Sequence, residues 1–167
     1  VEVGLTDALM PGVVQLSGRL DVPSAAGTLA PVQGLGADLK GDLSLEAIKE
    51  FSVNFAQAGQ SLGSVSLSGP FNMDTMAADL SLKISQLDQR VLNLAGAAAG
   101  VRFENTSVNV DQNIKVAAGL SQVDIRGGLQ VDKLNAIQGE LRVPEMDLKV
   151  ENAVSVAFDA QQAPSKI

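Results

Sequence analysis

Apolar and polar residues alternate with a period of two through most of this 167-residue chain, and this pattern constrains the fold more than any other feature. Between Val14 and Val22 the even positions are apolar except for Gly18, and the odd positions are polar. Successive side chains of a β-strand point to opposite faces. The stretch is therefore predicted to be a strand with one buried and one solvated face.

The same alternation recurs along the chain, which predicts about ten strands. Short connections favour antiparallel neighbours, because parallel strands need long crossovers and near-continuous apolar runs. We expect an all-β domain: a curved, mainly antiparallel sheet with an aliphatic inner face, forming either a groove or a sandwich. The apolar positions of the further runs lie in residues 35–45, 51–55, 65–73, 76–84, 101–110, 114–116, 123–131, 137–143 and 146–158.

One segment, from Asp88 to Ala99, breaks the period of two and predicts a short helix. Asp88 is a good N-cap residue and Gly100 a good stop. We expect the helix to plug one end of the sheet, burying Leu92 and Ala95. The alternative is a gate or lid over an apolar groove.

Other segments predict connections rather than strands. A helical turn is expected from Thr6 or Asp7 to Met10, and residues 45–50 are ambiguous. Residues 23–36, rich in Pro, Gly and Ala, predict a long loop or a short helical connection. Residues 1–160 are expected to form one domain, followed by a flexible tail over residues 161–167.

Composition excludes most catalytic and metal chemistry. The chain has no His and no Cys, and aromatic residues make up only 3% of it. Asp111-Gln112-Asn113 lacks the spacing of a calcium loop and predicts a turn. Twelve scattered basic residues against nineteen acidic ones leave no positive stripe for a nucleic acid. We expect no enzymatic activity, no catalytic or metal-binding residues and no cofactor.

A weakly repeated sequence motif places a glycine among the apolar positions of several predicted strands. Gly there bends the strand or lets another group approach closely. Two interpretations follow: the glycines open space over the apolar face, or they curve an ordinary packed sheet. The four residues concerned are Gly18, Gly41, Gly69 and Gly139.

Two stretches of the sequence resemble bacterial envelope proteins of the AsmA-like and TamB-like family. The first is Gly-Thr-Leu-Ala-Pro at 27–31, continuing through Leu35 to Lys-Gly-Asp-Leu-Ser-Leu at 40–45. The second is the order of strand, strand and small helix formed by residues 66–71, 78–84 and 87–100. The resemblance covers roughly the middle half of the chain.

The resemblance implies a function as well as a fold. Members of this family are anchored in the inner membrane, lie in the periplasm, and carry a curved sheet with an apolar groove implicated in moving phospholipids towards the outer membrane. The chain departs from them by its shortness and by lacking an N-terminal membrane helix, so we expect a periplasmic segment of a longer protein whose membrane anchor lies outside it.

The expected ligand is a phospholipid or another lipid with acyl chains, bound or conducted along the groove in support of outer-membrane lipid homeostasis; the resemblance leaves protein partners in the envelope unidentified. The alternative is a structural or interaction β-sandwich module of an envelope protein, without a ligand, in which the aliphatic face is an ordinary core. The candidate lining residues are Leu20, Leu43, Leu67, Phe71, Leu80, Leu82, Leu129 and Leu141.

Overall fold

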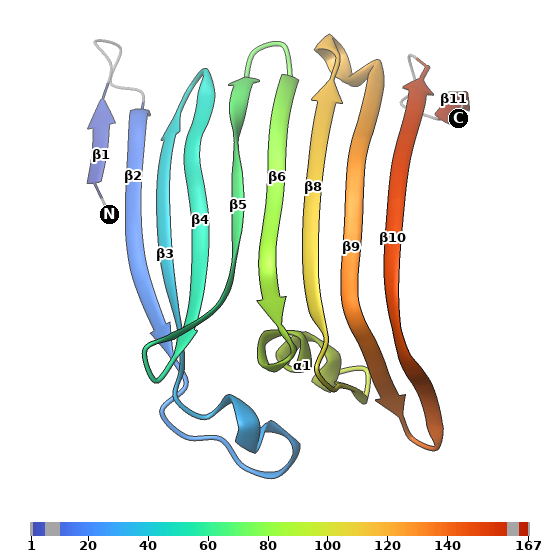
Figure 1. Cartoon of the computed structure of the whole chain (residues 1–167). Coiled ribbons are helices and arrows are strands. Elements are labelled where there is room, and N and C mark those ends of the chain that lie inside the picture. The colour runs from blue at the N-terminus through green and yellow to red at the C-terminus, as the bar shows by residue number, and fades with distance from the viewer. Residues whose placement is uncertain (1, 6–10, 160–163, 167) are drawn as a thin grey trace.

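A computed structural model describes residues 2–5, 11–159 and 164–166, and it confirms the predicted all-β fold. The strands form one open antiparallel sheet in chain order (Figure 1), except that β7 pairs with β9 outside this order. The sheet is a single layer and not a sandwich. Its strands are β1 (Glu2–Leu5), β2 (Pro11–Asp21), β3 (Leu35–Ser44), β4 (Ala47–Gln57), β5 (Gln60–Asn72), β6 (Ala77–Asp88), β7 (Val101–Phe103), β8 (Ser107–Val116), β9 (Gln122–Gln138), β10 (Leu141–Phe158) and β11 (Pro164–Lys166).

The register of the strands brings their apolar positions to one side of the sheet. Directly paired residues of antiparallel strands share a face, so each row of partners is either apolar or polar. One such row crosses from β2 to β10 through Gly18, Leu39, Val53, Val65, Ile84, Val110, Leu129 and Val150. The alternation read from the sequence is therefore in phase across the whole sheet.

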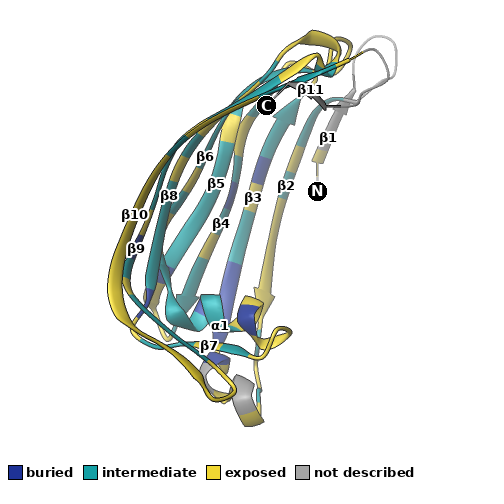
Figure 2. Ribbon diagram, turned by 90° about the vertical axis from the view of Figure 1, so that its right-hand side faces the viewer, coloured by how far each residue is buried: buried dark blue, intermediate teal, exposed yellow. Residues whose placement is uncertain are grey.

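The strands are bowed along their length, and two short helices lie on the concave side at one end (Figure 2). These are the α-helix α1 (Gln89–Ala97) and the 3-10 helix η1 (Gly27–Val32). They close a small core with the ends of the strands beneath them. Its buried members are Val32, Leu35, Leu62 and Val91, with Val22, Ala25, Phe55 and Leu87 packed around them.

The predicted helix and its N-cap are confirmed. The Asp88 side chain accepts a hydrogen bond from the Arg90 backbone N–H at 2.9 Å, and Asn93 exchanges two hydrogen bonds with the backbone of Phe103 in β7. The buried residues of the helix are Val91 and Gly96, and not Leu92 and Ala95 as expected. The helix contacts both η1 and β7, and these contacts select a different stripe of its surface.

Several further predictions concerned the connections between strands and the end of the chain. The ambiguous residues 45–50 divide into a turn and the start of β4 at Ala47, and the helical alternative for residues 23–36 is realised as η1. Of the expected tail, residues 164–166 form β11 and pair with the end of β10. The predicted helical turn at residues 6–10 lies outside the described residues.

The single layer leaves an unusually large surface. The chain exposes 10545 Å², whereas a compact monomer of 17.2 kDa exposes roughly 7,800 Å². Within the part of the chain that the structure describes, only six apolar residues are buried: Val32, Leu35, Ala37, Leu62, Val91 and Val131. No helix in that part is long and apolar enough to span a membrane.

Candidate functional site

The concave side of the sheet is the candidate site. We call it the concave apolar face and define it by the inward residues of β2 to β10 beyond the core under α1 and η1. Its side chains are almost all aliphatic and pack mainly on their neighbours in the sheet. Its main members are Val14, Leu16, Leu39, Leu43, Phe51, Val53, Val65, Leu67, Leu80, Leu82, Ile84, Val110, Ile114, Ile125, Leu129, Val150 and Val154.

Burial differs sharply between the two parts of this side. Under α1 and η1, Leu35 is 2% and Leu62 is 1% exposed. On the uncovered part the side chains are half-buried, and at the β10 edge Val150 is 40% exposed. Large contiguous apolar surfaces are uncommon on monomeric proteins and are typical of interaction or ligand-binding sites.

One polar pair interrupts the aliphatic surface. Gln112 of β8 and Asn152 of β10 lie in the same row on either side of Gly127 of β9. The Gln112 Nε2 donates to Asn152 Oδ1 at 2.7 Å, and Asn152 Nδ2 donates back to Gln112 Oε1 at 3.3 Å. The two amides can meet across β9 because Gly127 carries no side chain.

The convex side of the sheet carries the charges. Lys83 pairs with Asp111, Lys149 pairs with Glu151, and Arg19 lies between Asp21 and Asp38. These ion pairs are exposed, so they contribute little to stability and mainly keep this side hydrated.

Asp79 and Lys115 form another pair on the convex side, at 3.2 Å. Hydrogen bonds from Asn113 and Lys115 lower the pKa of Asp79 below its ordinary value. The carboxylate is therefore fully ionised at neutral pH. An exposed, paired carboxylate of this kind is a poor general acid or base.

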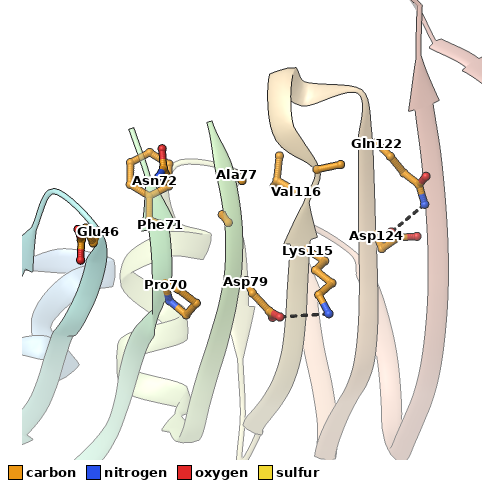
Figure 3. A pocket seen from close by; sticks show the side chains of 12 residues that line it. Glu46, Pro70, Phe71, Asn72, Ala77, Asp79, Lys115, Val116, Gln122 and Asp124 are labelled. Carbon is orange, nitrogen blue, oxygen red and sulfur yellow. Dashed lines mark hydrogen bonds and ion pairs between the residues drawn. The ribbon is translucent and has the colours of Figure 1, made fainter. Parts of the chain in front are cut away.

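A depression in the surface lies on the convex side (Figure 3). It has a volume of about 600 Å³ and lies over the ends of β5, β6, β8 and β9, with Pro70, Ala77 and the Asp79–Lys115 pair among its lining residues. In the same depression, Gln122 Nε2 donates to Asp124 Oδ2 at 2.8 Å. Within the described residues no group of acidic side chains is arranged to hold a metal ion.

Five of the eight predicted lining residues lie on the concave apolar face. Leu43, Leu67, Leu80, Leu82 and Leu129 lie in its paired rows and are half-buried. Phe71 lies at the end of β5, opposite Ala78, and lines the depression of Figure 3. Leu20 and Leu141 lie at strand ends and are 68% and 74% exposed.

Two of the four predicted glycines lie on the concave apolar face. Gly18 faces open space, with nothing within 4 Å of where a Cβ would lie. A Cβ on Gly41 would come within 2.8 Å of Leu16 Cγ, so the space over this glycine is filled by a neighbouring leucine. Gly18 thus fits the predicted open position, whereas Gly41 makes room for packing inside the sheet.

The other two glycines have local backbone roles. Gly69 has a φ of +140°, and a Cβ there would lie 2.1 Å from the Asp79 carbonyl oxygen. A glycine is needed at this position because the backbone of β6 approaches closely, and a side chain here would disrupt the sheet. Gly139 has a φ of +58° and lies in the turn between β9 and β10, away from the face.

Sequence reasoning missed the amide pair. It assigned residues 111–113 to a turn, whereas they lie in the middle of β8. Three consecutive polar residues conceal the alternation, although Gln112 keeps the parity of Val110 and Ile114. The sequence signal for the amide pair was this shared parity of Gln112, together with the same break in the apolar pattern at Asn152 in β10.

Comparisons with protein-family models, with curated proteins and with solved structures found no match to this chain.

Proposed function

We propose that the concave apolar face binds the acyl chains of a lipid. The observation that carries this proposal is a mainly aliphatic surface that spans strands β2 to β10. The helices α1 and η1 cover it at one end, and the other described residues leave it open. A second protein layer would ordinarily cover such a face. Lipid chains can take that place.

The chemistry of the face suits acyl chains. Each methylene removed from water contributes about 0.8 kcal/mol before the costs of association, and a chain lying on an open surface gains part of this. Aliphatic side chains without directional polar groups discriminate poorly between chain lengths. We therefore infer a binding surface of broad specificity.

The size of the face allows an extended chain to lie across several strands. A row of paired residues runs from Leu16 to Asn152 over eight strands, and strand spacing gives it a width of roughly 34 Å. The neighbouring row, from Leu39 to Val150, presents an aliphatic side chain at every strand that it crosses. We propose on this basis, and from the resemblance to AsmA-like proteins, a periplasmic segment that conducts phospholipid.

A second candidate is a structural or interaction module that pairs with another strand. The observation that favours it is the outer edge of β10, which β11 covers only near Phe158. Six of its large apolar side chains are exposed: Leu141, Val143, Met146, Leu148, Val150 and Val154. An exposed, apolar edge strand is a template for strand addition.

Native mass spectrometry of protein purified without detergent, followed by lipid extraction, tests the lipid proposal. We expect bound phospholipid on the wild type. Leu82→Glu places a charge on the concave apolar face and should abolish loading, because a charge is costly to cover with hydrocarbon. Ser81→Glu changes the adjacent residue on the convex side and should leave loading unchanged. A lipid-free wild type, or equal loss in both variants, would favour the structural module.

A further inference from the structure

The amide pair stands in the middle of aliphatic rows. Where β8, β9 and β10 pair, the rows on its two sides consist of Val110, Leu129 and Val150, and of Ile114, Ile125 and Val154. Gln112 and Asn152 are the polar side chains between them, and both are half-buried. A polar group surrounded in this way is costly unless it gains hydrogen bonds, so its place on this face calls for an explanation.

Gly127 makes the pair possible, and a substitution cannot easily replace it. Its φ is +157°, and a Cβ there would lie 2.0 Å from the Asp111 carbonyl oxygen. The row therefore has a gap at β9 over which the two amides meet. Both amide groups are held at a fixed place on the uncovered part of the face.

The pair retains hydrogen-bonding capacity. A primary amide has two N–H donors and an oxygen with two acceptor positions. The reciprocal bonds use one donor and one acceptor of each residue, and the second Gln112 donor reaches the Gly128 carbonyl only at 3.5 Å. In the hydrogen bonds of the described residues, Asn152 Nδ2 keeps one donor that is directed to no protein acceptor. A purely hydrocarbon ligand lying over the pair would leave this donor unsatisfied.

The charge of the surroundings selects among polar ligand groups. The six flanking side chains are uncharged, and Lys149 and Glu151 alternate to the convex side of β10. A carboxylate or phosphate bound here would be removed from water without a cation, which is unfavourable. A neutral carbonyl needs only the donor that the amide offers.

We propose that the Gln112–Asn152 pair binds the neutral carbonyl of an acyl ester, at the point where the polar part of a lipid joins its chains. The Asn152 amide donates to the carbonyl oxygen, and the aliphatic rows on either side hold the chain that follows. This inference rests on the proposed lipid-binding function and adds to it a fixed position along the face. The ligand class is an esterified acyl lipid rather than a hydrocarbon or an ionised fatty acid.

Two probes that differ only in the carbonyl test the inference: dioctanoylglycerol, a diester, and dioctylglycerol, its diether. A single hydrogen bond to a neutral acceptor predicts that the wild type binds the ester about three- to tenfold more tightly. The double variant Gln112→Leu with Asn152→Leu should bind both probes equally and keep the affinity for the ether. Gln130→Leu, on the convex side of β9, is the matched control and should keep the preference.

The outcomes separate the two proposals. The role of the amide pair alone is overturned if the wild type binds the ether and the ester with equal affinity. It is also overturned if the ester preference survives in the double variant. Failure of the wild type to bind either probe overturns the lipid-binding face as well. Should the double variant fail to fold, Gln112→Met repeats the test. The methionine side chain has a length similar to that of glutamine but cannot hold the Asn152 amide in place. Loss of the ester preference is again the expected result.

Discussion

Asp88 joins β6 to α1 and illustrates how much a single side chain determines at this end of the sheet. Its carboxylate accepts hydrogen bonds from the Arg90 backbone and from the Arg90 guanidinium, with Nε at 2.8 Å. Arg90 in turn donates to Gln57 of β4 at 2.9 Å. The hydrogen bond from the Arg90 side chain is the main cause that lowers the pKa of Asp88 below its ordinary value of 3.8.

Replacing this cap should destabilise the protein in a pH-dependent way. We expect Asp88→Ala to lower the free energy of unfolding by about 1 kcal/mol at neutral pH. Because the pKa of Asp88 is lower in the folded state, its contribution is complete above the unfolded pKa and is lost as the pH falls below about 4. Urea denaturation at pH 7 and pH 3 checks this, with Asp74→Ala in an exposed turn as the control. A destabilisation that is equal at both pH values would contradict the role of the ionised cap.

At the scale of the element, α1 and η1 divide the sheet into a packed end and an open face. Leu62 is buried beneath the helices, whereas Leu82 lies half-buried on the concave apolar face. Both are leucines on neighbouring strands of one sheet. Their contributions to stability should differ because a cavity forms only where the surroundings are closed.

Truncation of the two leucines measures this difference. Leu62→Ala should lower the free energy of unfolding by about 3 kcal/mol, since it removes contacts and leaves a cavity. Leu82→Ala should cost only about 1 kcal/mol, because its side chain already meets solvent. Chemical denaturation of both variants gives the comparison. Equal losses would mean that the open face is as tightly packed as the core, which contradicts the single-layer account.

The elements could be predicted from the sequence because alternation with a period of two reports the parity of each strand directly. The N-cap at Asp88 was predictable for the same reason, as its chemistry is local. The buried stripe of α1 was not, because the contacts of η1 and β7 select Val91 and Gly96. The roles of Gly69 and Gly127 depend on carbonyl oxygens of neighbouring strands, which no local pattern records.

At the scale of the whole molecule, the described residues form a sheet with a charged convex side and a mainly aliphatic concave side, and none of them adds a second layer over the concave side. Sequence parity predicted the two sides and left open whether the apolar one is a groove or a closed core. The register and the absence of a second sheet in the described residues answer that architectural question.

Site-specific photo-crosslinking along β6 tests the proposed lipid-binding face most directly, because consecutive residues of one strand lie on opposite sides. Benzoylphenylalanine is placed in turn at Leu80, Ser81, Leu82 and Lys83, and the purified protein is irradiated with phosphatidylethanolamine and phosphatidylglycerol vesicles. The account predicts lipid adducts at Leu80 and Leu82 and none above background at Ser81 and Lys83. Adducts that are equal at all four positions, confined to the convex pair, or absent throughout would contradict a lipid-binding concave face.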